Sequence, residues 1–199
     1  MLIYLVRHGE TDWNLAGRIQ GQEDNDLNET GREQARLTAK KLSGVTFDAA
    51  FCSTLIRAVH TAQIILGEQP VPLTQDARIR EIGFGRYEGE MIEEIQRNEQ
   101  NPLHNFFAHP EGYIPPETAE SYQELYRRSG EFVKEVLCPA QDKWQNVLVV
   151  GHGAWNRSIL NPLMGIALKD FESWPLENCA VRIIELKDGK MHLLDKQPM

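Results

Sequence analysis

The sequence predicts an α/β protein, specifically a three-layer α/β/α sandwich with a mainly parallel central sheet and an inserted lid lobe. Short apolar runs, typical of strands buried on both faces, alternate with segments whose apolar residues recur at helical spacing. Two late apolar runs, 180–186 and 191–194, flank Asp188-Gly189 and predict a closing hairpin. At 199 residues the chain is expected to form a single domain over 1–199.

The first predicted strand spans residues 2–6 and is entirely apolar. Gly9 follows it closely, which favours the end of the strand and the start of a loop. A helix is expected next, with Thr30 as its N-cap, because Glu33 stands at capping-box spacing.

A second strand is predicted over residues 47–52. Ser53 or Thr54 is expected to cap the helix that follows, which places Arg57 in the first turn of that helix. The positive end of the helix dipole would then lie beside Arg57, at the carboxyl edge of the sheet.

Residues 91–119 differ in character, since they are polar and interrupted by prolines. They are expected to form an inserted lobe with a short helix followed by irregular backbone. Ser121 and Glu124 have capping-box spacing again and predict a helix that runs to Pro139. A third buried strand is predicted over residues 146–150. It is followed by a helix that Pro162 disturbs or ends.

Composition excludes several classes of function. The formal charge of -8 argues against nucleic acid or an anionic membrane as the main partner. No signal peptide and no apolar stretch of membrane-spanning length is expected, which favours the cytoplasm. Cys52, Cys138 and Cys179 are far apart without metal-binding spacing, and are expected to be reduced thiols.

Reactive or cationic side chains follow three of the predicted strands. Arg7 and His8 come after the first strand, Arg57 after the second and His152 after the third. Each of them alone could be an ordinary surface residue, but a parallel sheet gathers its strand ends along one edge. Cations that repel one another need an anion between them, and arginine suits phosphate oxygens. The expected ligand is therefore a phosphoryl group.

The same residues carry a family resemblance. The segments LVRHGETDWN, STLIRAVHTAQ, REIGFGRYEG and VVGHGAWNRSIL occur in this order between Leu5 and Leu160. Together they resemble the histidine phosphatase superfamily, in the branch that includes the phosphoglycerate mutases. Residues 177–181 are similar to the closing strand of that family.

The resemblance implies that His8 is the nucleophile and forms a phosphohistidine, and that Glu81 gives a proton to the leaving oxygen. An imidazole nucleophile must be neutral, and neighbouring arginines lower its pKa. A covalent intermediate divides one displacement into two, with water attacking in the second. Glu81 can serve both steps if its surroundings keep it protonated for the first; otherwise it is a surface carboxylate paired with Arg80.

The resemblance also implies which residues hold the phosphoryl oxygens: Arg7, Arg57 and His152, with Asn14 and Gln20 as further polar contacts. Such cations stabilise the charge of the transition state. No cofactor and no metal ion is expected, because there is no comparable cluster of ligands and the arginines would repel a cation.

The expected activity is hydrolysis of a small phosphorylated metabolite, a phosphomonoester. The alternatives are mutase-type phosphoryl transfer within phosphoglycerate, a metal-dependent hydrolase and a scaffold without activity. Only 70 residues separate Glu81 from His152, which favours an open site and therefore the phosphatase. The sequence does not identify the substrate or the oligomeric state. Its position suggests that part of the lobe contacts the rest of the substrate, through Phe106, Phe107, His109 and Tyr113.

Overall fold

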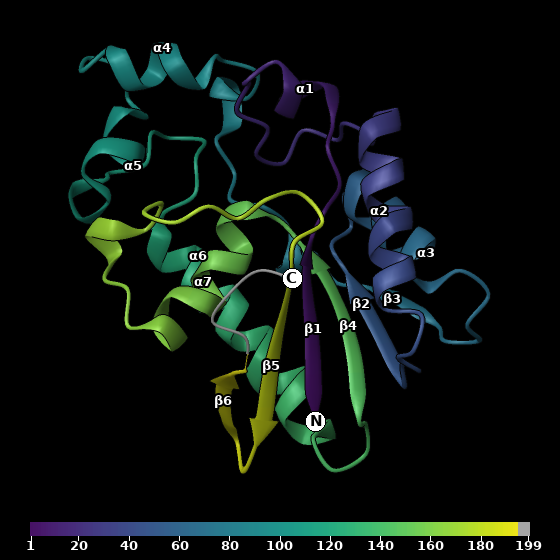
Figure 1. Ribbon diagram of the computed structural model, residues 1–199. Helices are drawn as coiled ribbons and strands as arrows, with labels where there is room; N and C mark the ends of the chain where they lie inside the picture. The colour runs from purple at the N-terminus through teal and green to yellow at the C-terminus, as the bar shows by residue number, and fades with distance from the viewer. Residues whose placement is uncertain (195–199) are drawn as a thin grey trace.

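The computed structural model describes residues 1–194 and has a central sheet of six strands in the order β3-β2-β4-β1-β5-β6 (Figure 1). The first four strands in this order are parallel, and the last two are added antiparallel. The predicted fold class is therefore confirmed. The strands are β1 (Leu2–Arg7), β2 (Ala49–Cys52), β3 (Leu73–Gln75), β4 (Asn146–Gly151), β5 (Val181–Lys187) and β6 (Lys190–Leu193).

Alternation along β1 produces two cores, one on each face of the sheet. Ile3 and Leu5 belong to one apolar cluster, whereas Tyr4 and Val6 belong to the other. Successive side chains of a strand point to opposite faces, so a run of apolar residues is buried only when helices cover both faces. Figure 1 shows α2 (Glu29–Lys41) and α3 (Ile56–Leu66) on one face, and α6 (Tyr122–Phe132) and α7 (Gly153–Met164) on the other.

The N-terminus of α2 corrects one prediction. Asn28, and not Thr30, is the N-cap: its side chain accepts the backbone N–H of Gly31 at 2.8 Å. Thr30 lies inside the first turn. Asparagine is preferred over threonine at this position, and the apparent capping box at Thr30 competes with a better cap two residues earlier.

The N-terminus of α3 corrects a second prediction. Neither Ser53 nor Thr54 is the N-cap, because the helix begins at Ile56 with Leu55 in the capping position. The backbone N–H of Ile56 donates instead to the carboxylate of Asp24, at 2.7 Å. A cap supplied by a distant segment has no local sequence signal. Arg57 does lie in the first turn, as predicted.

The C-terminal half follows the sequence prediction closely. Ser121 and Glu124 form the capping box of α6, and the helical path continues as a π-helical turn, Val133–Leu137. Pro162 lies inside α7, which ends two residues later at Met164. Asp188 and Gly189 both have positive φ, as a tight hairpin turn requires, and join β5 to β6.

Residues 91–119 contain two short helices, α4 (Ile92–Arg97) and α5 (His104–Ala108). The expectation of a single short helix followed by irregular backbone is wrong in this respect, because a second turn forms where Leu103 and Phe106 are buried. Figure 1 shows α4 and α5, together with α1 (Asp12–Leu15), beyond the carboxyl ends of the parallel strands. These helices therefore lie next to the edge where a ligand is expected.

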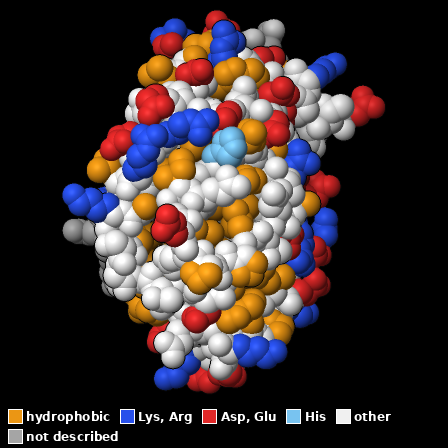
Figure 2. Space-filling view, turned by 90° about the vertical axis from the view of Figure 1, so that its right-hand side faces the viewer, with side chains coloured by type: hydrophobic (Ala, Val, Ile, Leu, Met, Phe, Trp, Pro, Cys, Tyr) orange, Lys and Arg blue, Asp and Glu red, His pale blue; other side chains and the backbone are white. Residues whose placement is uncertain are grey.

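The surface carries charges of both signs. On the face seen in Figure 2, Lys and Arg side chains alternate with Asp and Glu side chains around the rim, with apolar side chains between them. Within residues 1–194, no helix combines the length and the apolar character that crossing a membrane requires.

Candidate active site

His8 and His152 lie side by side at the carboxyl ends of two paired strands. In the register, Arg7 of β1 is opposite Gly151 of β4, so the residue that follows each strand projects from the same edge. The two imidazole rings have their centroids 5.1 Å apart. The Nδ1 of His8 lies 2.7 Å from the carbonyl oxygen of Gly9, to which it donates. Its Nε2 therefore keeps the lone pair that a nucleophile needs.

Two arginines adjoin this pair. Arg57 is completely buried, and its two terminal nitrogens donate to the carbonyls of Gly21 and Glu23, each at 2.7 Å. Arg7 donates to the carbonyl of Leu176. The Nε atoms of both arginines have no hydrogen-bond partner within the described protein. Carbonyl oxygens thus orient both guanidinium groups while donors remain for a ligand.

The electrostatics of the site keep both imidazoles uncharged. Burial, followed by the charges of Arg57 and Arg7, lowers the pKa of His8 well below its ordinary value. Burial and Arg57 act in the same way on the pKa of His152. Burial also lowers the pKa of Arg57 to about 10, which leaves this guanidinium charged at neutral pH. The site therefore combines neutral imidazoles with permanent cations, an arrangement that suits an anionic ligand.

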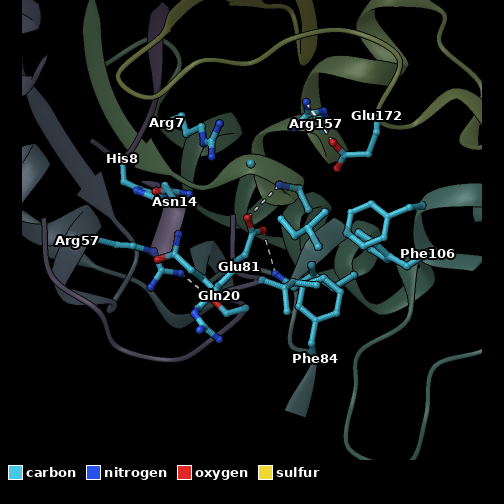
Figure 3. A pocket seen from close by; sticks show the side chains of 18 residues that line it. Arg7, His8, Asn14, Gln20, Arg57, Glu81, Phe84, Phe106, Arg157 and Glu172 are labelled. Atoms are coloured by element: carbon cyan, nitrogen blue, oxygen red, sulfur yellow. Dashed lines mark hydrogen bonds and ion pairs between the residues drawn. The ribbon is translucent and has the colours of Figure 1, made fainter. Parts of the chain in front are cut away.

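Glu81 is held at the N-terminus of α7. The backbone N–H groups of Ala154 and Trp155 donate to its carboxylate at 3.1 and 3.0 Å. The first N–H groups of a helix lack partners within it, so these two fix the position of the Glu81 side chain. Figure 3 shows Glu81 in the middle of the pocket, between His8 and Arg57 on one side and Arg157 on the other.

Asn14 and Gln20 also line this pocket. The side-chain oxygen of Asn14 accepts the backbone N–H of Thr11 at 3.2 Å, and that of Gln20 accepts the Thr11 hydroxyl at 2.9 Å. Because both amide oxygens are used by the protein, the amide N–H groups are the atoms available to an anion.

The loop after β1 is packed tightly against α2. A Cβ on Gly9 would lie 2.5 Å from the carbonyl oxygen of Gly31, and one on Gly31 would lie 2.1 Å from that of Glu10. Only glycine permits such a close approach of two backbones. The loop that orients His8 is therefore fixed by a glycine contact with a helix that starts some twenty residues later in the chain.

The structure brings the predicted site residues together with one difference. Six of them line a pocket that encloses about 190 Å³, but His152 is completely buried beside His8 and does not line it. Of the lobe residues, Phe106 and Phe107 line the pocket, whereas the ring of Tyr113 packs against those of Phe106 and Tyr122. The six are Arg7, His8, Asn14, Gln20, Arg57 and Glu81.

Three charged residues of the pocket were not anticipated from the sequence. One is Arg18, whose Nη1 donates to the carbonyl of Gly89 at 2.7 Å. Arg157 and Glu172 line its wall and form an ion pair, with 3.3 Å between Nη2 and Oε2. A signal for Arg157 existed, because it stands four residues after Gly153 and hence on the same face of α7. Glu172 follows the short helical turn Leu168–Asp170 and lies outside any regular helix. No spacing in the sequence therefore indicates that it belongs to the pocket.

Within residues 1–194, no group of three or more His, Cys, Asp or Glu side chains is arranged to hold a metal ion. The charged groups that act on the pKa of His8 are arginines. The arrangement can bind an anion and present it to a neutral imidazole.

Fold and site together define a class of protein: a three-layer α/β protein in which two adjacent histidines and two arginines meet at the strand ends beside an anion pocket. The model of the histidine phosphatase superfamily (branch 1) matches residues 3–197. The chain belongs to this family, which confirms the resemblance seen in the sequence motifs.

Individual relatives differ in the activity that their names state. Phosphoserine phosphatase 1 of Hydrogenobacter thermophilus is 31% identical over 96% of this chain and 90% of its own length. A probable phosphoglycerate mutase, GpmB of Yersinia pestis, is 34% identical over 94% of this chain and 86% of its own. The solved structure of Bacillus stearothermophilus YhfR superposes with a TM-score of 0.89, at 33% identity, over 98% of this chain and 96% of that one.

Proposed function

We propose that this protein hydrolyses a small phosphorylated metabolite, a phosphomonoester, through a phosphohistidine on His8. The observation that carries the proposal is the uncharged imidazole of His8 in contact with a second imidazole and beside Arg7 and Arg57. The phosphatase named among the relatives supports the same class of reaction.

In the first step, Nε2 of His8 attacks phosphorus and the bond to the ester oxygen breaks. Glu81 gives a proton to that oxygen, so that an alcohol leaves instead of an alkoxide. Arg7 and Arg57 stabilise the negative charge on the phosphoryl oxygens as the transition state forms. The ring nitrogens of His152, which have no partner within the described protein, are available to one of these oxygens.

In the second step, water attacks the phosphohistidine and the P–N bond breaks. Glu81, now ionised, takes a proton from that water, and inorganic phosphate leaves. None of these bond changes requires a metal ion or an organic cofactor, so we expect full activity in the presence of EDTA. Loss of activity with EDTA would favour a metal-dependent hydrolase instead.

The phosphoenzyme is the direct test. Incubation with a 32P-labelled phosphomonoester should label the protein, and the label should resist alkali but not acid, as phosphohistidine does. We expect His8→Ala to abolish both labelling and turnover. His192→Ala, which removes an exposed histidine on β6, should leave both unchanged. A labelled His8→Ala protein would overturn the assignment of the nucleophile.

Glu81→Gln tests the proton donor. The amide retains the shape of the side chain but cannot supply the proton, so alkyl phosphates should slow by about 10²-fold or more, the usual contribution of general acid catalysis. p-Nitrophenyl phosphate should slow much less, because its leaving group needs no proton. Equal slowing of both substrates would contradict this role.

A mutase is the second candidate, because one relative is named a probable phosphoglycerate mutase. The same phosphohistidine would then return its phosphoryl group to the other hydroxyl of the substrate. Parallel measurement of phosphate release and of the interconversion of 2- and 3-phosphoglycerate separates the two. We expect phosphate release to dominate.

A further inference from the structure

Beyond the phosphoryl-binding end, the pocket wall carries one ion pair that the proposed chemistry does not use. Arg157 comes from α7 and Glu172 from the segment after Leu168–Asp170. Figure 3 shows both on the far side of Glu81 from His8 and Arg57. Arg157 is only 7% exposed, whereas the side chain of Glu172 is 36% exposed and accessible from the pocket.

The protein holds Arg157 in place, but not every N–H donor of its guanidinium has a hydrogen-bond partner within the described residues. Its Nη2 donates to the carbonyl of Trp174 at 2.9 Å, and its guanidinium lies 5.3 Å from the centre of the Trp174 ring. Its Nε has no partner within the described protein. Its Nη1 would be 3.6 Å from a Cβ on Gly153, a residue of the pocket wall. The guanidinium thus keeps donors that a ligand can use.

Such an arrangement is unfavourable for stability alone. A buried polar atom without a partner costs about 1–3 kcal/mol, and a buried charge costs more unless its partners are excellent. The pair is not part of the sheet or of either apolar cluster. An accessible carboxylate next to a buried guanidinium with free donors is better explained by recognition of a ligand.

Charge balance indicates which ligand. Arg57 adjoins the phosphoryl position, and the pair lies on the far side of Glu81 from it (Figure 3), so the pair faces the remainder of the substrate. Arg18 also lines the pocket, but its Nη1 donates to the carbonyl of Gly89. A substrate carboxylate on Arg157 would lie close to the Glu172 carboxylate and repel it. An ammonium group alone would lie close to Arg157. A substrate that carries both groups keeps the wall neutral and gives each residue an opposite charge.

We propose that Arg157 and Glu172 determine substrate specificity by binding an amino acid phosphomonoester, with its carboxylate on Arg157 and its ammonium group on Glu172. This inference rests on the proposed phosphatase function and adds the class of substrate. The pocket volume of about 190 Å³ accommodates a compact member of that class.

The test compares four small phosphomonoesters. O-phospho-L-serine carries both groups, 3-phosphoglycerate only the carboxylate, O-phosphoethanolamine only the ammonium group, and ethyl phosphate neither. The unmodified protein should have its highest kcat/KM for O-phospho-L-serine, by at least tenfold over each of the others. Arg157→Gln should lower kcat/KM at least tenfold for the two carboxylate-bearing substrates, through KM, and change that of ethyl phosphate less than threefold. Glu172→Gln should reduce the preference for O-phospho-L-serine over 3-phosphoglycerate at least tenfold.

Two matched controls isolate the pair. Arg182 is also buried and lies 5.2 Å from the Trp174 ring, but it does not line this pocket. Arg182→Gln should therefore leave the substrate preference unchanged. Asp170→Asn removes an exposed carboxylate two residues before Glu172 and should also have no effect on it.

The outcomes separate this inference from the proposed function. A protein that hydrolyses none of the four substrates and forms no phosphoenzyme on His8 overturns the proposed function. A protein that hydrolyses ethyl phosphate through His8 but shows no preference for O-phospho-L-serine overturns only the role of the pair. Equal loss on all four substrates in Arg157→Gln also overturns it, because Arg157 would then act on the phosphoryl site through Arg7. Glu172→Gln changes an exposed side chain, so its substrate preference tests the role of the pair even if Arg157→Gln does not fold.

Discussion

His8 is neutral at neutral pH because two effects act on its pKa in the same direction. Burial removes the water that would stabilise the imidazolium, and the charges of Arg57 and Arg7 repel it. The same environment that makes the ring a nucleophile therefore makes the folded protein reluctant to bind a proton there. Catalytic competence and acid sensitivity are consequences of the same burial.

Stability should depend on pH through this histidine. The pKa of His8 is near 6.5 in the unfolded chain and well below that in the folded protein, so the unfolded state binds more protons as pH falls. Stability is then lost below pH 6.5, by about 1.4 kcal/mol per pH unit for each such histidine. In His8→Asn this contribution disappears, so urea unfolding from pH 7 to 5 should show a shallower decline than in the unmodified protein. Parallel declines would contradict the assigned direction of the pKa.

At the scale of elements, the site depends on how a few segments are fastened together. The loop after β1 contacts α2 through Gly9 and Gly31, and the segment with Glu81 is fixed by Arg128 of α6. Arg128 donates to the carbonyl of Arg78 at 2.8 Å and to that of Glu81 at 3.0 Å, and pairs with Glu120. Neither the Gly9–Gly31 contact nor Arg128 touches a substrate in the proposed mechanism. Each of them holds in place a residue that does, His8 in the first case and Glu81 in the second.

Gly31→Ala should destabilise the protein although it lies within a helix. Alanine is favoured over glycine in a helix by about 1 kcal/mol. Here its Cβ would lie 2.1 Å from the Glu10 carbonyl oxygen, so the two segments must separate, which costs about 1–3 kcal/mol. Gly44→Ala is the control, since a Cβ there meets nothing within 4 Å. Urea unfolding should give a lower stability for Gly31→Ala only; equal stabilities would disprove the close contact.

Arg128→Lys should weaken the positioning of Glu81. A lysine cannot replace a planar fork that binds several carbonyls at once. We expect kcat to fall about tenfold or more for alkyl phosphates and less for p-nitrophenyl phosphate, as for Glu81→Gln. Arg127→Lys, at a neighbouring exposed residue paired with Glu131, should change neither rate. A uniform loss on all substrates would indicate a structural role only.

At the scale of the whole molecule, the strand order assembles the site. β4 lies between β1 and β2, so three strand ends from distant parts of the sequence meet at one edge. His8, Arg57 and His152 follow these strands directly or within the first turn of the next helix. Helices on both faces bury the strands, which holds these positions rigidly.

Vanadate, a phosphate analogue, should therefore stabilise the entire fold. A ligand that binds only the folded state at 100 times its Kd adds about 2.7 kcal/mol. For a protein of this size the Tm should rise by about 5–10 °C. Arg57→Met should lose most of this shift, whereas Arg36→Met, at an exposed position of α2, should keep it. Absence of a shift in the unmodified protein would contradict an oxyanion site.

The local pattern of the sequence was sufficient to predict much of the secondary structure. Apolar periodicity predicted five of the six strands in place and the closing turn at Asp188-Gly189, because each depends on neighbouring residues. The capping box at Ser121 was predicted for the same reason, whereas the caps of α2 and α3 were not. At Ile56 the partner is Asp24, which local pattern cannot indicate.

The sequence by itself determined the α/β class, the family and the polar residues at the strand ends, since alternation and motif order are properties of the chain alone. Only the tertiary structure decided that His152 is completely buried beside His8, that Arg128 fixes the Glu81 segment and that Arg157 and Glu172 form one ion pair. These features are contacts between segments far apart in the sequence. They exist only once the two apolar cores have set the distance between the helices and the sheet.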